Sequence, residues 1–294
     1  MICWVCRPTF ALVAGLALLS CFGFLTEAQK EQPSTSAFVF LQMSDPQFGM
    51  YTKDSGFEQE TANFDFAIAT ANRLRPRFVI VCGDLVNKPG DASQIAEYRR
   101  ISGKLDKGIR IYHVAGNHDV GNQPTPESVA AWKKIFGPDH YSFREGGLYG
   151  IVLNSSLIHS PQDAPKEYEE QRAWLEAELM KAKSFAAAHI VVFQYHPWFL
   201  ATADEPDQYF NIPLVRRGPL LEIFRSARVR YLLSGHYHRN AVAKDGDIEA
   251  ITTGPVGMPL GNGRSGFRIV RVTKESITHE YAEFGAVPNR ISPP

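Results

Sequence analysis

Five short polar clusters in the chain each follow a run of apolar, strand-like residues. In sequence order they are Asp45-Pro46-Gln47, Gly83-Asp84, Gly116-Asn117-His118-Asp119, Tyr195-His196-Pro197 and Gly235-His236-Tyr237-His238. Their carboxylate, amide and imidazole groups are ligands that divalent metals use in proteins. Because the ends of parallel strands lie along one edge of an α/β sheet, where ligands bind, we expect the clusters to converge in space. The pattern therefore predicts a hydrolase with two metal ions.

Each cluster taken alone has a plainer explanation. An aspartate at a strand end, such as Asp45 or Asp84, can brace a turn, and Asn117 can be an ordinary turn residue. His196 alone can be a hydrogen-bonded structural histidine. What favours a metal centre is the ordered combination of Gly-Asp, Gly-Asn-His-Asp and Gly-His-x-His, each after a strand.

The elements that would position these clusters follow from the spacing of apolar residues. Strands are expected over 37–43, 78–82, 109–114, 149–153, 189–194 and 229–234, and helices over 56–75, 91–105, 127–136 and 165–187. After His238 the pattern changes to short strands over 241–244, 248–252, 268–273 and 277–282, the first two joined by a hairpin signal at Asp245-Gly246. This order predicts an α/β fold in which one domain contains two sheets covered by outer helices.

Composition limits the classes of partner. The chain has 294 residues, of which 44% are hydrophobic and 21% charged, as in ordinary globular proteins. Its 31 basic and 31 acidic side chains give a formal net charge of zero. The positive field that drives nucleic-acid binding is therefore missing, and no basic run suggests a membrane-binding patch. We expect no nucleic-acid partner.

The first 28 residues have the pattern of a targeting segment. Arg7 precedes an apolar stretch over 10–25, and Thr26-Glu27-Ala28 offers small residues for signal peptidase, so cleavage after Ala28 would export the protein to the periplasm or the exterior. An uncleaved anchor is the alternative, but the stretch is shorter than the roughly 20 residues of a bilayer span. A third reading takes Leu18-Leu19-Ser20-Cys21 as a lipobox, with a lipid anchor on Cys21.

Cysteine usage agrees with a fold held by its core. Cys3, Cys6 and Cys21 lie in the targeting segment, which leaves Cys82 as the single thiol of the mature chain. One thiol cannot form an intramolecular disulfide, even in an oxidising compartment. The apolar strand around Cys82 indicates an inert core thiol rather than a nucleophile.

At these motifs the chain resembles the calcineurin-like metallophosphoesterase superfamily, which is marked by Asp-x-His, Gly-Asp, Gly-Asn-His-Asp/Glu, a single His and Gly-His-x-His. The segments 44–49 and 194–199 are further similar to a branch of calcineurin-like phosphoesterase-domain-containing proteins that includes serine/threonine phosphatases. The resemblance implies a four-layer α/β/β/α sandwich of two mixed sheets over 37–285. It also implies two divalent metal ions (Mn, Fe or Zn, with Mg as an alternative), whose bridging hydroxide attacks a phosphomonoester.

The resemblance also implies a role for each matching residue. Asp45, Gln47 and His238 would bind the first metal, Asp84 would bridge both, and Asn117, His196 and His236 would bind the second. His118 would face the substrate and stabilise the phosphoryl charge or protonate the leaving group. Asp119 would orient His118 or brace its loop. Asn117 and His118 would thus meet the substrate, and Arg239 could reach a phosphate oxygen, although a surface or salt-bridging arginine is the plainer interpretation.

Two positions depart from the superfamily pattern. Gln47 stands where most members have a histidine, so the first site would bind metal less tightly or prefer manganese or magnesium over zinc. Asn87 stands where many relatives have an aspartate that supports the catalytic histidine. The long stretch over 196–213 shows little periodicity, and we expect it to form the rim of the substrate site.

Three functions remain open at this point. The first is a phosphatase acting on a phosphoprotein, a nucleotide or a small organic phosphate. The second keeps the centre but cleaves diesters, such as cyclic nucleotides or phospholipid head groups. The third is a non-catalytic binding module, and the presence of His118 with seven plausible metal ligands argues against it. A serine hydrolase is a poor fit, because no Gly-x-Ser-x-Gly motif is present.

Overall fold

The computed structural model describes residues 1, 2, 4 and 36–292 of the chain. Of the expected signal segment 1–28, only residues 1, 2 and 4 are therefore described, and the lipobox cysteine Cys21 lies outside the described part. Residues 36–292 fall in one compact unit, Pro33–Pro294. No helix among the described residues is long and apolar enough to cross a bilayer.

The first sheet has five strands in the order β11-β10-β1-β2-β3. Their bounds are β1 Phe38–Met43, β2 Phe78–Cys82, β3 Arg110–Val114, β10 Gly266–Val272 and β11 Ile277–Glu283. The strands β1, β2 and β3 run parallel, whereas β10 pairs antiparallel with β1 and with β11. The ends of β1, β2 and β3 therefore meet at one edge of this sheet.

The second sheet has six strands in the order β4-β5-β6-β7-β9-β8. Their bounds are β4 Tyr141–Glu145, β5 Leu148–Val152, β6 His189–Phe193, β7 Tyr231–Ser234, β8 Ala241–Asp245 and β9 Ile248–Thr252. The four central strands, β5, β6, β7 and β9, are parallel, and β4 and β8 close the two edges in antiparallel pairing. Both sheets are therefore mixed.

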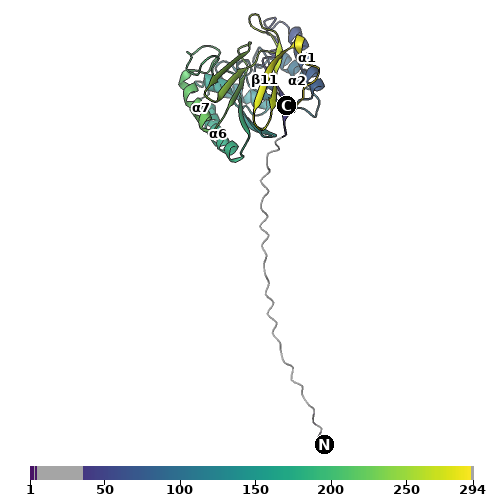
Figure 1. The fold of residues 1–294 in the computed structure, drawn as a ribbon, viewed down its shortest axis with the longest axis vertical. Coiled ribbons are helices and arrows are strands. Elements are labelled where there is room, and N and C mark those ends of the chain that lie inside the picture. The colour runs from purple at the N-terminus through teal and green to yellow at the C-terminus, as the bar shows by residue number, and fades with distance from the viewer. Residues whose placement is uncertain (3, 5–35, 293–294) are drawn as a thin grey trace. The chain divides into compact units, whose positions relative to one another are not determined.

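The sheets pack face to face, and helices cover their outer faces (Figure 1). The helices are α1 Glu58–Leu74, α2 Ala92–Ser102, α3 Asn117–Val120, α4 Pro126–Phe136, α5 Ser155–His159, α6 Pro165–Ser184 and α7 Leu214–Ser226, with a 3-10 turn Phe284–Ala286. Aromatic rings fill the space between the sheets: Phe40 stacks on Phe78 at 4.5 Å and meets Phe193 edge-on at 5.9 Å. Residues of α1 and α2 pack on the first sheet, and those of α6 and α7 on the second. The four-layer α/β/β/α sandwich is thereby confirmed.

Local sequence explains where the early helices begin and end. The predicted cap Asp91 accepts hydrogen bonds from the backbone N–H groups of Ser93 at 3.0 Å and Gln94 at 3.2 Å, which stabilises the start of α2. Helix α1 ends at Leu74, and the next residue, Arg75, caps it with a left-handed backbone (φ 51°) directly before Pro76. The strands and long helices expected from periodicity agree with the structure to within a few residues.

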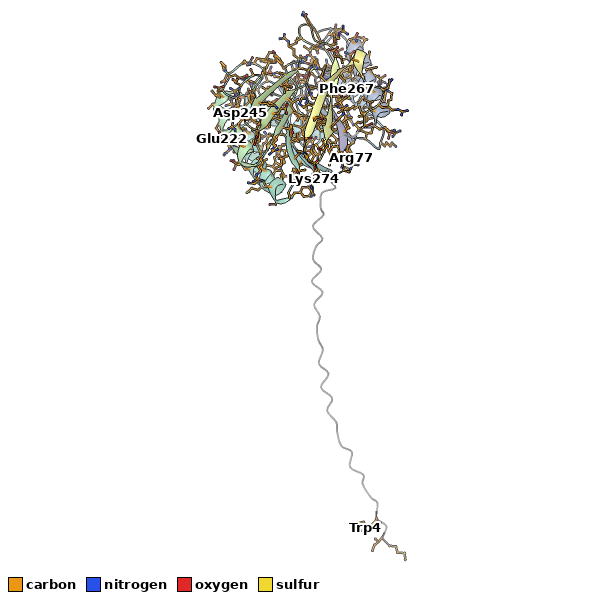
Figure 2. The ribbon with its side chains drawn as sticks, in the orientation of Figure 1. Trp4, Arg77, Glu222, Asp245, Phe267 and Lys274 are labelled. Carbon is orange, nitrogen blue, oxygen red and sulfur yellow. The ribbon has the colours of Figure 1, made fainter. Side chains whose placement is uncertain are left out.

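Five elements were not expected from the sequence: the short helices α3 and α5, the 3-10 turn Phe284–Ala286, strand β4 and helix α7. Strand β4 is a short edge strand, and α7 contains Gly218 and Pro219, which interrupt the helical pattern. Helix α7 is nevertheless firmly attached to its surroundings. The buried Arg217 donates to the carbonyl oxygen of Trp198 at 3.2 Å, and Arg225 bonds both Glu222 and Asp245, which Figure 2 shows close together. Helix α7 thus holds the segment that follows β6 against the second sheet.

Candidate metal centre

The backbone turns sharply at the predicted ligands. Left-handed φ angles occur at Asp45 (49°), Gln47 (39°), Asp84 (48°), His236 (69°) and His238 (53°). Such angles in non-glycine residues cost on the order of 1–3 kcal/mol each and persist where the surrounding structure enforces them. Strain concentrated on five of the predicted ligands indicates a site that the fold holds in a fixed geometry.

Close backbone contacts bring the strand ends together. The N–H of Asp45 donates to the carbonyl oxygen of Gly83 at 3.1 Å, and the N–H of Gln47 donates to that of Asp84 at 2.8 Å. A side chain at Gly235 would overlap the hydroxyl of Ser44, so only glycine fits there. The clusters after β1, β2 and β7 therefore converge as the sequence predicted.

Asp45, Asp84 and His238 form the first half of the site. Nε2 of His238 lies 3.2 Å from Oδ1 of Asp45, while its Nδ1 lies 2.6 Å from the carbonyl oxygen of Met258. Burial opposes ionisation of Asp45, but the charge and hydrogen bond of His238 outweigh it and lower the pKa of Asp45. Burial likewise opposes the charged form of His238, and Asp45 overcomes this to raise the pKa of His238 to about 9. The Nε2 atom of His238 thus faces the carboxylates.

The surroundings of the Asp84 carboxylate favour a bound cation or proton beside it. Burial, and then the negative charge of Asp45, raise the pKa of Asp84 to about 8. Two buried carboxylates this close repel each other unless a proton or a cation lies between them. A divalent metal removes the repulsion and displaces the proton, so Asp84 fits the bridging position that the resemblance implied.

The second half of the site contains Asn117, His196 and His236. The rings of His196 and His236 lie 4.5 Å apart. Nε2 of His236 lies 3.2 Å from the carbonyl oxygen of Tyr209, which leaves Nδ1 free to act as a ligand. Burial lowers the pKa of His236 to about 4. Burial also lowers the pKa of His196 well below its usual value, and the nearby rings of His236 and His159 lower it further. Both imidazoles are therefore neutral, as metal ligands must be.

The amide side chains provide an independent test of the fit to metal ions. The buried oxygens Oε1 of Gln47 and Oδ1 of Asn117 have no hydrogen-bond partner within the described structure. Their NH₂ groups are engaged, with Asn87 Oδ1 at 3.2 Å and Asn122 Oδ1 at 2.8 Å respectively. A buried acceptor without a donor is costly, and a cation is a natural partner for it. The donor set therefore fits divalent metals.

The site does not consist of acidic and imidazole groups alone. Within residues 36–292, no three His, Cys, Asp or Glu side chains come together closely enough to hold an ion by themselves. The amides of Gln47 and Asn117 belong to the donor set, and a hydroxyl lies between the carboxylates: Tyr195 donates to Oδ1 of Asp45 at 2.5 Å and also contacts Oδ2 of Asp84. Tyr195 belongs to a predicted polar cluster, but the sequence gives its hydroxyl no role.

His118 and Asp119 have separate tasks. The backbone N–H of His118 donates to Oδ1 of Asp84 at 2.8 Å, and its Nδ1 lies 2.5 Å from the carbonyl oxygen of Asn87. Asp119 instead accepts hydrogen bonds from the backbone N–H groups of Leu85 (3.0 Å), Val86 (3.3 Å) and Gly116 (2.8 Å). Asp119 was expected either to orient His118 or to brace its loop, and these backbone contacts correspond to the second role. His118 is partly exposed, so its ring is accessible to a substrate.

The segment after β6 reaches the site, as expected for its rim. Tyr209, 55% exposed, places its carbonyl oxygen at His236 and its hydroxyl 3.5 Å from Nδ2 of Asn117. The ring of His159, a residue to which the sequence assigned no role, stacks on His196 at 4.7 Å. Its position on α5 could not be read from the sequence, because that helix is only five residues long.

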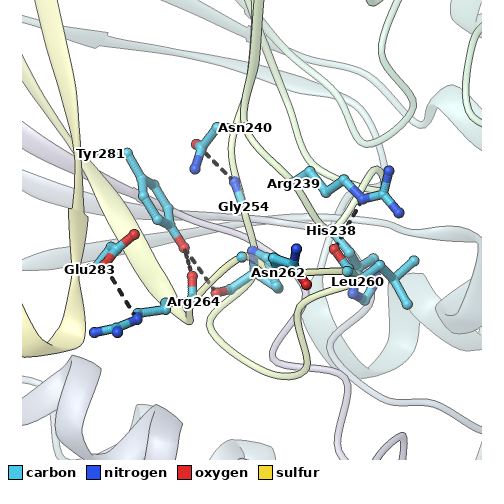
Figure 3. Close-up of a pocket in the computed structure, with 12 residues that line it drawn as sticks. His238, Arg239, Asn240, Gly254, Leu260, Asn262, Arg264, Tyr281 and Glu283 are labelled. Carbon is cyan, nitrogen blue, oxygen red and sulfur yellow. Dashed lines mark hydrogen bonds and ion pairs between the residues drawn. The ribbon is translucent and has the colours of Figure 1, made fainter.

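A pocket of about 440 Å³ opens beside His238 (Figure 3). Its wall includes Arg239, Asn240, Asn262 and Tyr281. The exposed Arg239 donates from Nε to the carbonyl oxygen of Leu260 at 3.0 Å, and its guanidinium lies 5.4 Å from the ring centre of Tyr237. Its terminal nitrogens remain available at the pocket, so Arg239 is both a surface residue and a candidate contact for an anionic ligand.

Comparisons with known proteins agree with this architecture. The family model described as calcineurin-like phosphoesterase matches residues 38–240. The chain is 36% identical over 269 residues to a Bos taurus protein named serine/threonine-protein phosphatase CPPED1, and the match covers 86% of each chain.

Two solved structures share the fold. A purple acid phosphatase from yellow lupin (Lupinus luteus) has a TM-score of 0.65 at 14% identity, over 86% of this chain and 52% of that one. A dimetal phosphatase from Danio rerio has a TM-score of 0.56 at 16% identity, over 82% and 98%. At these identities the likeness concerns the fold alone.

Proposed function

The chain belongs to the calcineurin-like phosphoesterase family, and we propose that it hydrolyses phosphomonoesters at the edge where its parallel strands end. It is a metal-dependent phosphoesterase, a hydrolase of phosphoric ester bonds. The observation that supports this site most strongly is the meeting of Asp45 and Asp84 beside the unpaired amide oxygens of Gln47 and Asn117.

The proposed ligands divide into two groups around Asp84. Asp45, Gln47 and His238 would hold one divalent ion, Asn117, His196 and His236 would hold the other, and Asp84 would be shared by both. Two such ions activate water and neutralise the charge that develops on the phosphoryl group. Three of the proposed donors to the first ion are carboxylate or amide oxygens, from Asp45, Gln47 and Asp84. We therefore propose that this ion is manganese or magnesium in preference to zinc, with iron as the alternative.

His118 is the proposed catalytic residue of the chain itself. Its backbone N–H is fixed on Asp84 and its Nδ1 on the carbonyl oxygen of Asn87, so the ring orientation is set from two sides. If Nδ1 carries the proton that this carbonyl accepts, Nε2 remains for the substrate. Protonated in turn, it would donate to the oxygen of the leaving group, a contribution worth roughly 10²–10⁴ in rate.

The proposed substrate is a phosphorylated protein or a small phosphomonoester. The pocket beside His238 is open to solvent and would accommodate the leaving group, with Arg239 at its wall. The bovine relative's name refers to a serine/threonine-protein phosphatase, which supports an alkyl phosphate on a protein as one candidate.

Hydrolysis of para-nitrophenyl phosphate and of its bis-ester, with Mn²⁺ added, tests this proposal. We expect the monoester to be preferred and turnover to fall by about 10²-fold or more in His118→Ala. His140→Ala is a suitable control, because His140 packs on Trp174 and contacts Asp139, neither of which is a proposed site residue. Preference for the diester would indicate a phosphodiesterase instead of a phosphatase. Turnover that does not depend on added metal would contradict the proposed metal centre.

We also propose that the protein is exported. The apolar stretch over 10–25 and Ala28 support a cleaved signal segment. Determining the N-terminus of the protein purified from its natural host tests this: a start at Gln29 agrees with cleavage, a lipid on Cys21 with the anchor, and an intact Met1 contradicts both.

A further inference from the structure

Tyr209 presents an exposed hydroxyl group beside the candidate metal centre. The seven proposed ligands are buried, and none of them is more than 4% exposed, whereas Tyr209 is 55% exposed. Its hydroxyl oxygen lies 3.5 Å from Nδ2 of Asn117, and its ring centre lies 4.9 Å from that of His236. Tyr209 therefore borders the centre on the side that faces solvent, from which a substrate must approach.

The hydroxyl proton of Tyr209 is not used within the protein. At the contact with Asn117 the amide N–H can only donate, so the oxygen of Tyr209 is the acceptor there. Among the described residues, no side chain or carbonyl oxygen accepts a hydrogen bond from the Tyr209 O–H. Because a hydroxyl can donate one hydrogen bond while it accepts others, Tyr209 keeps a donor for a ligand.

The segment that carries Tyr209 is fixed by buried hydrogen bonds. The carboxylate of Glu205 accepts from the backbone N–H of Leu200 at 2.9 Å and from Nδ2 of the buried Asn211 at 2.7 Å. The backbone carbonyl oxygen of Tyr209 is itself held 3.2 Å from Nε2 of His236. The phenol is therefore positioned before the substrate arrives, and a donor fixed in this way can stabilise developing charge without reorganising.

Hydrolysis of a phosphomonoester creates a need for such a donor. In the transition state of phosphoryl transfer, negative charge is spread over the three equatorial oxygens of the phosphoryl group. His118, the residue next to Asn117 in the chain, is partly exposed and is the proposed donor to the leaving oxygen. The phosphoryl oxygens require a separate donor, and Tyr209 adjoins the same ligand, Asn117.

We propose that Tyr209 is a second catalytic residue, whose phenol O–H donates a hydrogen bond to a nonbridging oxygen of the phosphoryl group. This inference rests on the proposed function. The O–H bond stays intact throughout, so Tyr209 transfers no proton, and the proton for the leaving oxygen still comes from His118.

Tyr209→Phe tests the proposal, because it removes the hydroxyl and keeps the ring and the backbone carbonyl. The turnover number and KM for para-nitrophenyl phosphate are measured at saturating Mn²⁺, together with inhibition by inorganic phosphate and by orthovanadate, which adopts the five-coordinate geometry of the transition state. Equilibrium dialysis measures the affinity for Mn²⁺. Tyr168→Phe is the matched control, since Tyr168 is a partly buried tyrosine that packs on the core between α6 and the second sheet.

We expect the turnover number of Tyr209→Phe to fall at least about ten-fold, because removing one donor to a developing charge costs roughly 10²–10³-fold in an enclosed site and this site is open to water. Inhibition by orthovanadate should weaken at least about ten-fold, whereas KM and inhibition by phosphate should change less than about three-fold. The affinity for Mn²⁺ should stay unchanged, and Tyr168→Phe should match the wild type.

A fall in turnover smaller than about ten-fold, or an equal weakening of phosphate and orthovanadate inhibition, would overturn the catalytic role of Tyr209 and leave the proposed function intact. A loss of Mn²⁺ affinity in Tyr209→Phe would also overturn it, because the residue would then support a ligand instead of the substrate. A wild type that hydrolyses no phosphomonoester with Mn²⁺ present would contradict the proposed function itself.

Discussion

At the scale of single residues, Asn87 shows how the chain keeps a contact whose usual side chain is missing. Many relatives of the resembled superfamily have an aspartate there to support the catalytic histidine. Here the backbone carbonyl of Asn87 meets Nδ1 of His118 at 2.5 Å, so the side chain is not needed for that purpose. The Asn87 amide instead accepts from Nε2 of Gln47 and donates to Asp54. The side chain of Asn87 thus orients the proposed metal ligand Gln47, while its backbone carbonyl orients the ring of His118.

This division predicts a specific kinetic result for Asn87→Ala. Removing the amide leaves Gln47 without its orienting partner, so the Mn²⁺ concentration for half-maximal activity should rise about 10-fold or more. Turnover at saturating Mn²⁺ should change little, because the backbone carbonyl remains. Steady-state assays over a Mn²⁺ titration measure both quantities. A large fall in saturated turnover with unchanged metal dependence would contradict this assignment.

Asp119 supports a second residue-scale prediction. Its carboxylate accepts three backbone N–H groups, and an asparagine offers only one oxygen for them. Asp119→Asn should lower the free energy of unfolding by about 1–3 kcal/mol and reduce turnover by displacing the adjacent His118. Urea denaturation compares it with Asp247→Asn, an exposed control. Equal stability of the two variants would show that Asp119 does not brace the loop.

The sequence could predict that most of the proposed ligands come together, because they follow strands in recognisable clusters. The types and order of Asp45, Asp84, Asn117 and His238 were enough to place them together. The contact of the Tyr195 hydroxyl with both carboxylates was not predictable, because it depends on which face of the chain after β6 the residue occupies and on how closely the sheets approach. The stacking of His159 on His196 likewise comes from a short helix without a sequence signal.

At the scale of elements, β3 carries a half-buried histidine, with a buried Nε2 atom, that has consequences for acid stability. His113 lies between the rings of Tyr98 and Phe136, each 5.7 Å away, and its Nε2 has no partner in the described structure. Burial lowers the pKa of His113 to about 4, below the value near 6.5 expected for the unfolded chain. Above pH 6.5 both states are neutral there. As the pH falls toward 4, only the unfolded state takes up the proton, so stability is lost.

His113→Phe should therefore make the fold less sensitive to acid. The loss of unfolding free energy between neutral pH and about pH 4.5 should shrink by up to about 3 kcal/mol relative to the wild type. Phenylalanine keeps the aromatic contacts and removes the proton site. Urea denaturation at a series of pH values gives the two curves. Parallel curves would mean that His113 does not cause acid sensitivity.

Strands and helices were predictable where periodicity and caps agreed, as for β2 and for α2 with its cap Asp91. The prediction was incomplete where tertiary contacts override local signals. Helix α7 forms despite Gly218 and Pro219, because Arg217 is buried beneath the segment after β6 and bonds its backbone. Such support comes from residues distant in sequence and has no local pattern.

At the scale of the whole molecule, the two sheets contribute different parts of one site. The first sheet carries the proposed ligands Asp45 and Asp84 after adjacent parallel strands, and the second carries the proposed ligands His236 and His238. Metal ions bound across this boundary would tie the two sheets together. Ligand binding to the native state alone stabilises it by about 2.7 kcal/mol when the free ligand is 100 times its dissociation constant.

Metal removal should therefore destabilise the entire fold. A chelator is expected to lower the midpoint of thermal unfolding of the wild type, and added Mn²⁺ should restore it. Asp84→Asn, which lacks the shared carboxylate, should respond much less to either treatment. Differential scanning calorimetry measures the midpoints. A wild type that unfolds at the same temperature with and without metal would argue against a centre joining the sheets.

The central claim is that two metal ions share Asp84 at the strand ends. An anomalous difference map from a crystal of the Mn²⁺-loaded protein tests it most directly. We expect two peaks roughly 3.5–4 Å apart, both in contact with the Asp84 carboxylate. No peak at Asp84, or a single peak at full metal saturation, would contradict the two-metal centre.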